Sequence, residues 1–178
     1  MNTIVYDKDA EFIPFFREYE EYGFLSNFAP YSFYYTMNDG EEIKFFTAEH
    51  AVHFLKALLF KDINMSIAIR RTWTPKEAKH LGRLVKNFDS KIWDENKEKI
   101  YHDVIKAKFT RNRFSNMVDL RQMLLDTGDA ILVECSPYDR IWGIGYSKDS
   151  KEFINKEFDK WGQNLLGKIL MNVRSEIK

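Results

Sequence analysis

The chain has little of what usually crosslinks, anchors or exports a protein. Its 178 residues include a single cysteine, Cys135, which excludes an internal disulfide bond. No run of 18 apolar residues occurs, so no membrane-spanning helix is expected. The first residues lack the basic and apolar regions of a signal peptide. These absences predict a cytoplasmic protein without a membrane partner.

The chain also lacks an excess of charge of either sign. Lys and Arg number 27, Asp and Glu number 27, and the formal net charge is zero. Proteins that bind nucleic acid through bulk electrostatics are normally basic, so binding along a broad positive surface is not expected. An anionic substrate must therefore be recognised by a few local side chains.

Proline and glycine are scarce as well, with four and eight residues. No linker, repeat or low-complexity stretch divides the chain, which predicts one domain over residues 1–178. Hydrophobic residues make up 44% and aromatic residues 16%, so a disordered chain is excluded and an aromatic-rich core is expected.

Local patterns predict an α+β domain that is mainly helical and has a small sheet. Apolar runs at 32–36 and 42–46 flank an Asp-Gly turn signal, as in a β-hairpin. Helices are predicted from Thr47 to about 60, from the capping box at 74–77, over about 90–109, and from Ser115 to near 128. A buried strand is expected at 130–135, followed by helical segments at 153–161 and 165–173. Strands and helices do not alternate, so a doubly wound sheet is not expected.

Several common catalytic and cofactor-binding motifs are incomplete or absent. Gly143-Ile144-Gly145 lacks the third glycine of a dinucleotide-binding loop, since Lys148 stands there, and no Walker loop occurs. Glu49 precedes His50 and His53, but this order is not the His-Glu-x-x-His of zinc proteases. Neither a cofactor nor a metal is therefore expected.

The helix after Thr47 carries three functional side chains on one face. Glu49, His53 and Lys56 are spaced i, i+4, i+7 among apolar neighbours. Burying a carboxylate, an imidazole and an amine is costly without a partner or a purpose. The alternative is a solvated charge ladder, but the apolar flanks leave little polar surface for it.

Three other clusters of polar residues are candidates for a functional site. Residues 134–145 directly follow a predicted buried strand and combine a carboxylate, an arginine, two aromatics and glycines. Loops at strand ends commonly carry function, although Tyr138 and Trp142 can also fill a core. Two shorter clusters lie at 23–28 and 81–83.

In this order, the clusters resemble the NADAR superfamily, which includes the YbiA-type N-glycosidases. The matching strings are FLSNF at 24–28, TAEH at 47–50 with Lys56, AKHLGR at 78–83, AKF at 107–109, ECSPYDRIWGIG at 134–145 and NLLGKILMNVR at 164–174. Together they cover nearly the whole chain. His53 stands where the family usually has glutamine, and Tyr101 where it has methionine.

The resemblance implies a YbiA-like fold and hydrolysis of the bond between ribose C1 and a base nitrogen. The family's substrate classes are ADP-ribose on guanine in DNA and phosphoribosylated pyrimidine intermediates of riboflavin synthesis. We expect an ADP-ribosylated base, in DNA or as a nucleotide, and keep the pyrimidine as the alternative. A non-catalytic module that binds ADP-ribose or a nucleotide, and a purely structural helical domain, are further alternatives.

Breaking the C1–N bond develops positive charge on the ribose, which a carboxylate stabilises. Glu49 is the first candidate and Asp139 the second, while a desolvated Lys56 can instead attack the sugar and form a Schiff base. Lys108 and Lys168 are weaker candidates for that amine. Tyr138 and Trp142 are expected to stack on a base, and Arg83 and Arg140 to bind phosphate. The complete set of expected substrate-binding residues is Ser26, Asn27, Phe28, His50, His53, Arg83, Trp93, Tyr138, Arg140, Trp142, Gly143 and Asn164.

Overall fold

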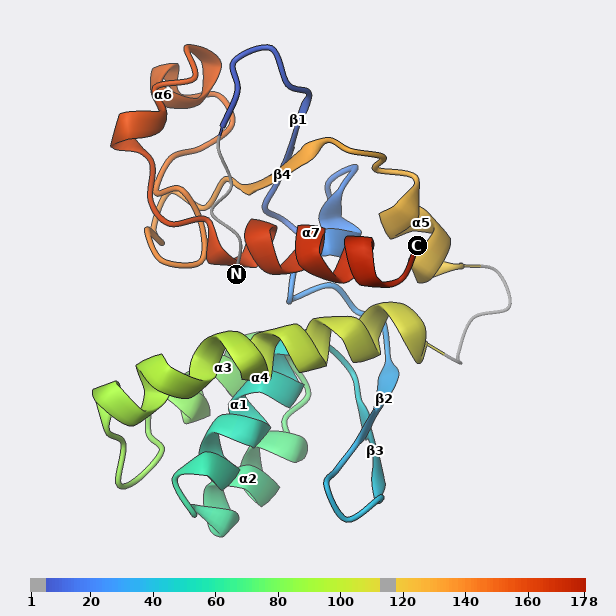
Figure 1. Ribbon diagram of the computed structural model, residues 1–178. Coiled ribbons are helices and arrows are strands. Elements are labelled where there is room, and N and C mark those ends of the chain that lie inside the picture. The colour runs from blue at the N-terminus through green and yellow to red at the C-terminus, as the bar shows by residue number, and fades with distance from the viewer. Residues whose placement is uncertain (1–5, 113–117) are drawn as a thin grey trace. The chain divides into compact units, whose positions relative to one another are not determined.

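The computed structural model describes residues 6–112 and 118–178, and its chain packs into two compact units. Unit 1 consists of Met1–Ser26 together with Gln122–Lys178, and unit 2 is the continuous segment Asn27–Arg121. Figure 1 shows the elements of both.

Unit 2 contains the predicted hairpin and four helices. Strands β2 (Phe33–Thr36) and β3 (Glu42–Phe45) pair antiparallel, with Phe33 opposite Phe45. The helices are α1 (Ala48–Leu59), α2 (Ile63–Arg70), α3 (Pro75–Gly82) and α4 (Ser90–Thr110). Helix α1 packs against each of the other three helices, so its side chains form the centre of this unit.

Side-chain caps explain where these helices begin. The Thr47 hydroxyl accepts a hydrogen bond from the main chain of His50 and starts α1. Thr74 and Glu77 form the predicted capping box of α3, with Pro75 in the first turn. Asp89 caps α4. The predicted helices at 47–60 and 90–109, and the helix start at 74, are confirmed.

Unit 1 is built around a short parallel strand pair. Strand β1 (Phe12–Phe15) lies beside β4 (Ile131–Glu134), with Phe12 opposite Ile131. Helix α7 (Leu165–Glu176) packs on β4. The remaining elements are the single-turn helices η1 (Gly23–Leu25) and η2 (Phe158–Lys160) and the short helices α5 (Leu120–Leu125) and α6 (Lys151–Ile154), of which α5 contains the boundary between the units.

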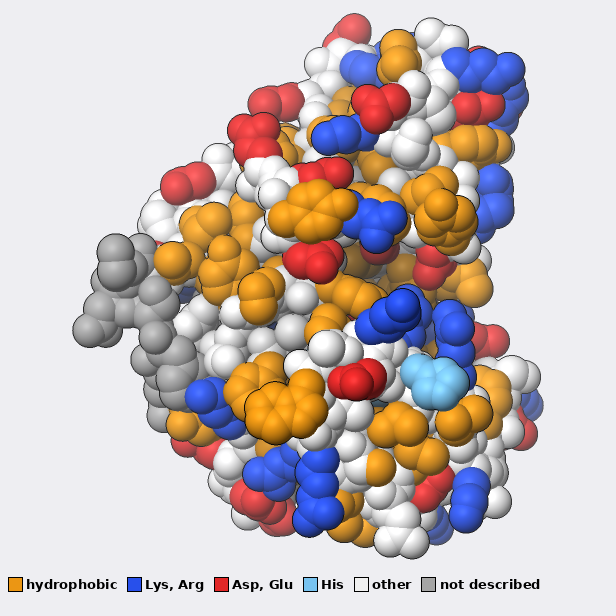
Figure 2. All heavy atoms as spheres, turned by 180° about the vertical axis from the view of Figure 1, so that it is seen from behind, with side chains coloured by type: hydrophobic (Ala, Val, Ile, Leu, Met, Phe, Trp, Pro, Cys, Tyr) orange, Lys and Arg blue, Asp and Glu red, His pale blue; other side chains and the backbone are white. Residues whose placement is uncertain are grey.

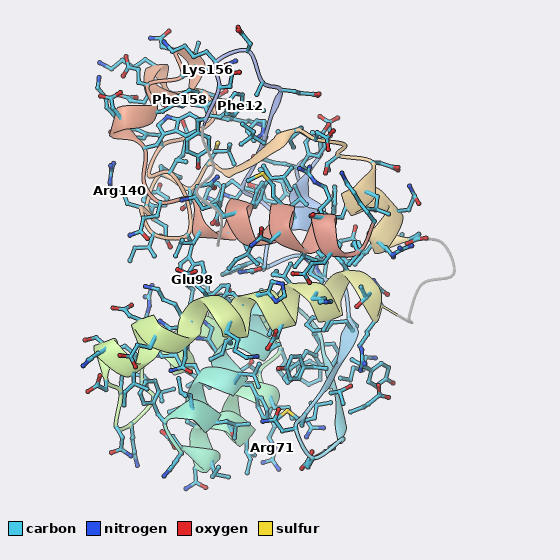
Figure 3. The ribbon with its side chains drawn as sticks, in the orientation of Figure 1. Phe12, Arg71, Glu98, Arg140, Lys156 and Phe158 are labelled. Carbon is cyan, nitrogen blue, oxygen red and sulfur yellow. The ribbon has the colours of Figure 1, made fainter. Side chains whose placement is uncertain are left out.

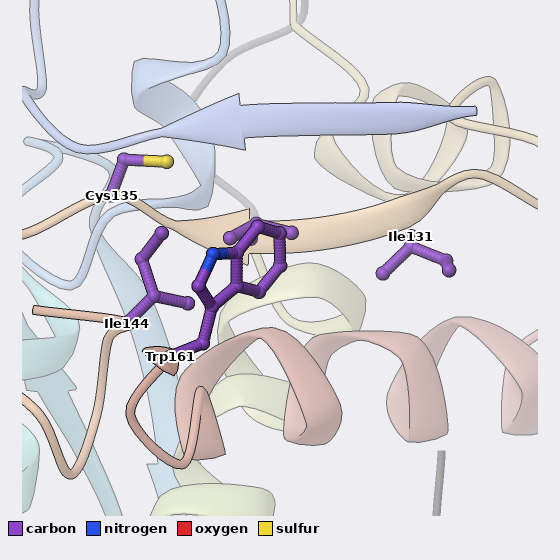
Figure 4. Close-up of a cluster of buried hydrophobic side chains, with 5 residues drawn as sticks. Ile131, Cys135, Ile144 and Trp161 are labelled. Atoms are coloured by element: carbon purple, nitrogen blue, oxygen red, sulfur yellow. The ribbon is translucent and has the colours of Figure 1, made fainter. Parts of the chain in front are cut away.

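The core of unit 1 is the aromatic-rich interior that the composition predicted. Ile131, Val133, Cys135, Ile144 and Trp161 form one buried cluster (Figure 4). Phe158 packs edge-on against Trp161 with ring centroids 4.9 Å apart. Burial raises the pKa of the Cys135 thiol, so this side chain acts as a small apolar residue and not as a nucleophile.

The predicted α+β class is confirmed, with the helices dominant, and the small sheet is divided into two strand pairs. Strand β1 and helix α2 were not predicted. The predicted start at Ser115 lies outside the described residues, and the helix described there begins at Leu120. The predicted segment 153–161 is only partly helical, because Asn155 ends α6 and Lys156 adopts positive φ. No helix among residues 6–112 and 118–178 is long and apolar enough to cross a membrane.

Candidate active site

Glu49 is an almost fully buried carboxylate in the first turn of α1. Its Oε1 atom lies 3.0 Å from Nε2 of His53, one helical turn further on. The same oxygen lies 3.8 Å from Nζ of Lys79 on α3. The Glu49 main-chain N–H donates to the carbonyl of Asn27, which ties residue 27 to the start of the helix.

The surroundings of Glu49 keep it ionised. Burial is the largest single influence on its pKa and raises it, but the hydrogen bond from His53 and the charges of His53, Lys79 and His50 together lower the pKa below its ordinary value. A carboxylate only accepts hydrogen bonds, so His53 donates to Glu49 through Nε2. The side chain is thus a fixed negative charge in a largely desolvated position.

Lys56 lies on the same helix but makes different contacts. Its Nζ donates to the main-chain oxygen of Gly82 at 2.9 Å. The ammonium also lies over two rings, 4.4 Å from the centroid of Phe88 and 5.3 Å from that of Trp93. Burial lowers the pKa of Lys56, and the nearby charge of Arg83 lowers it further.

Glycine 82 brings these groups together because it has no side chain. A Cβ atom at this position would lie 2.0 Å from Nδ1 of His53, so the ring of His53 packs directly on the α3 backbone. The Gly82 carbonyl at the same time accepts from Lys56. The end of α3 therefore holds His53 and Lys56 and places Lys79 beside Glu49.

The other expected residues of unit 2 surround this cluster. His50 is buried, and its Nδ1 lies 2.8 Å from the hydroxyl of Thr47. Phe28 lies beside Lys79, with 5.5 Å between its ring centroid and Nζ. Arg83 is exposed at the end of α3. Unit 2 therefore pairs Glu49 with His53 and Lys79, whereas Lys56 contacts Gly82 and lies near Arg83 and Trp93.

The expected residues of unit 1 lie mainly in the loop after β4. Asp139 accepts hydrogen bonds from the main chains of Ile141 and Trp142, both at 2.8 Å. Arg140, which Figure 3 labels, donates to the carbonyl of Lys160 and lies over the ring of Tyr146. Tyr138 is 86% exposed, and Trp142 is partly buried. Asp139 and Arg140 thus set the shape of this loop.

Gly143 and Asn164 connect that loop to the strand. A Cβ atom on Gly143 would lie 2.6 Å from the carbonyl oxygen of Glu134, so only glycine fits there. The amide of Asn164 is fully buried and bonds to the main chain of β4 at Leu132 and Glu134. Ser26 is buried near the end of η1.

Residues 14–178 match the sequence profile of the NADAR domain. The chain belongs to the NADAR family. It is similar to the N-glycosidase R617 of Acanthamoeba polyphaga mimivirus, with 38% identity over 153 residues that cover 85% of this chain and 86% of the relative. Its fold is similar to the NMR structure of the E. coli protein YbiA, with a TM-score of 0.68, 30% identity, and coverage of 94% of this chain and 84% of that one.

A third relative is the chloroplastic riboflavin biosynthesis protein PYRR of Zea mays. It is 30% identical over an alignment of 181 positions, which covers 95% of this chain but 26% of the maize protein. The similarity therefore covers only one part of that longer protein. Several relatives of this NADAR chain are named N-glycosidases, and the chain is accordingly a hydrolase of N-glycosyl compounds.

Two residues of this site, Lys79 and Gly82, were not predicted from the sequence. Lys79 lies on a different helix from Glu49, so helical spacing alone does not pair them, although it lies within the AKHLGR string. Gly82 was part of the same string, but its role appears only when His53 is seen against it. No group of three or more His, Cys, Asp or Glu side chains suited to a metal occurs in the described part of this NADAR chain.

Replacing Gly82 by alanine is expected to displace His53 from Glu49. The added methyl group has no room, and overpacking of this kind costs about 1–3 kcal/mol of stability. Loss of the 3.0 Å hydrogen bond raises the pKa of Glu49, so the acid limb of the activity profile moves to higher pH. The measurement is the pH dependence of base release together with the melting temperature.

Gly40→Ala provides the matched control. Its φ of +88° disfavours alanine, yet nothing lies within 4 Å of the added Cβ atom. This variant should lose stability and keep the acid limb in place. An unchanged acid limb in Gly82→Ala would mean that His53 does not set the ionisation of Glu49.

Proposed function

We propose that this protein hydrolyses the bond between ribose C1 and the base nitrogen of an ADP-ribosylated base, with ADP-ribose on guanine in DNA or in a nucleotide as the substrate. The observation that supports it is the buried, ionised carboxylate of Glu49, held by His53 and Lys79. A fixed negative charge of this kind stabilises an oxocarbenium-like sugar in a site that excludes water.

In the direct route, Glu49 also activates the water. The C1–N bond breaks, its electron pair leaves with the base nitrogen, and that nitrogen takes up a proton. Water adds to C1 while Glu49 receives the water proton. The roles of Arg83 in phosphate binding and of Trp93 beside the sugar or base remain predictions, as do those of the loop residues Tyr138, Asp139, Arg140 and Trp142.

In the second route, Lys56 is the nucleophile. Its neutral amine attacks C1 and expels the base, the ring oxygen leaves C1 as a hydroxyl, and the resulting Schiff base is then hydrolysed by water. Burial and the charge of Arg83 favour the neutral amine that this step requires. Lys108 is fully buried with its pKa lowered to about 7 by desolvation, and Lys168 is partly buried.

Borohydride trapping separates the two routes. If Lys56 forms the adduct, reduction during turnover leaves a stable sugar mass on the peptide that contains residue 56, and Lys56→Arg loses both the adduct and turnover. Lys168→Arg serves as the control and should retain both. Full turnover in Lys56→Arg with no trapped adduct would assign the reaction to water.

The alternative substrate is a phosphoribosylated pyrimidine intermediate of riboflavin synthesis. The similarity to the maize riboflavin biosynthesis protein favours it. Figure 2 shows acidic and basic side chains interspersed over one face of the molecule, which suits recognition by local arginines in either case. Incubation with each substrate, followed by mass spectrometry of the released base and sugar, decides between them.

A further inference from the structure

A groove lies within unit 2 between the C-terminal end of α2 and the length of α3. Its volume is about 590 Å³, within the ~300–1,000 Å³ typical of ligand pockets. The residues that line it are Ala68, Arg71, Thr72, Trp73, Lys76, Glu77, His80 and Leu81. None of the catalytic candidates lines it, so the groove is separate from the cluster around Glu49.

The groove has an excess of positive charge. Arg71, beside α2 in Figure 3, and Lys76 form no ion pair with the described residues. The one acidic side chain in the lining, Glu77, accepts hydrogen bonds from the main chains of Trp73 and Thr74 and from the Thr74 hydroxyl. These bonds hold its charge at the start of α3, so the two cations are available to an anion.

Trp73 gives the groove a flat apolar wall. Its side chain is 88% exposed, although its main-chain N–H is fixed by Glu77. An indole on a fixed backbone and open to solvent is a ready stacking surface for a nucleobase, and such stacking tolerates any sequence. A large exposed aromatic beside two unpaired cations matches a base that carries a phosphate better than it matches an apolar protein segment.

The groove is next to the catalytic cluster along the same helices. Helix α3 contributes Lys76 and His80 to the groove and Lys79 to the contact with Glu49. Burial lowers the pKa of His50, the residue that follows Glu49. The main chain of Thr72 and the charges of Glu49 and Glu77 oppose that shift, so the groove residues Thr72 and Glu77 influence His50.

We propose that this groove is a subsite for an unmodified nucleotide that flanks the modified one in a single strand. Its base stacks on Trp73, and its phosphates contact Arg71 and Lys76. The inference rests on the proposed function and deepens it, because a free phosphoribosyl pyrimidine has no neighbouring nucleotide to place here. Only a nucleic-acid substrate uses this surface.

The first test needs no activity. Binding of an unmodified, fluorescently labelled single-stranded oligonucleotide is measured by anisotropy at fixed salt. Trp73→Ala should weaken binding about tenfold, and Arg71→Ala with Lys76→Ala should reduce the dependence of affinity on salt. Tyr19→Ala removes another aromatic that is 79% exposed and should bind like the wild type. Equal affinity in the wild type and both groove variants would overturn the proposal.

The second test compares substrates. ADP-ribosylated guanine is supplied within a single-stranded oligonucleotide and as a free nucleotide. Trp73→Ala should raise KM for the oligonucleotide about tenfold, with kcat and all parameters for the free nucleotide unchanged. An equal loss on both substrates would place Trp73 in the catalytic site and overturn the flanking subsite. If the wild type cleaves neither substrate, the proposed function fails, whereas the binding test still decides the groove.

Discussion

Replacing Glu49 by glutamine is expected to slow release of the free base at least about a hundredfold and to leave substrate affinity within a few-fold of wild type. The amide has almost the same shape as the carboxylate and can still hydrogen-bond to His53, so the packing around α1 is preserved. What disappears is the negative charge that, in the proposed mechanism, stabilises the developing oxocarbenium ion. The loss is therefore expected in kcat and not in KM.

The measurement is single-turnover release of the base, with ligand affinity determined separately by calorimetry. Glu95→Gln makes the same chemical change at an exposed position of α4 and should leave both quantities unchanged. Wild-type turnover in Glu49→Gln would remove Glu49 from the mechanism and would direct attention to Asp139.

Replacing Asn164 by alanine is expected to destabilise unit 1 by about 3–5 kcal/mol, a large part of the ~5–15 kcal/mol by which a domain is stable. The side chain is fully buried. Its Oδ1 accepts from Glu134 N–H at 3.0 Å, and its Nδ2 donates to Leu132 O at 2.9 Å and to Tyr6 at 3.3 Å. Alanine leaves these buried groups without partners and must also adopt the left-handed φ of 51°.

Asn87→Ala isolates the backbone part of that cost. Asn87 also has a positive φ, of 55°, but it is exposed and its side chain makes no buried bonds. Its loss of stability in urea or heat should be about 1 kcal/mol or less. If Asn164→Ala were no more destabilising than Asn87→Ala, the amide would not be what holds β4 to the start of α7.

The sequence predicts those parts of this protein that depend on neighbouring residues. Thr47 and the Thr74–Glu77 box fix helix starts through hydrogen bonds within three residues, which explains why α1 and the start of α3 were found. Helix α4 was found from the helical spacing of its apolar residues. The pairing of Glu49 with His53 is likewise a contact between successive turns. Lys56 does not reach Glu49, because seven residues of helix extend about 10 Å.

What was missed depends on contacts between distant segments. Strand β1 contains Pro14 and has four residues, and only its partner β4 makes it a strand. The roles of Lys79 and Gly82 need α3 to be packed on α1, which no local pattern encodes. Helix α2 begins at a side-chain cap, Asp62, that could have revealed it.

The parallel pairing of β1 with β4 has a consequence for how the chain folds. Residues 16–130 separate the two strands, and the whole of unit 2 lies within that interval. On a ribosome, β1 emerges before unit 2 and has no partner until residues 131–134 have been made, whereas unit 2 is continuous and ends at residue 121. Formation of unit 2 also shortens the effective loop that unit 1 must close, which lowers the entropy cost of that step. The segment with Glu49 is thus expected to fold first, and unit 1 is completed only after Asn164 and helix α7 have been made.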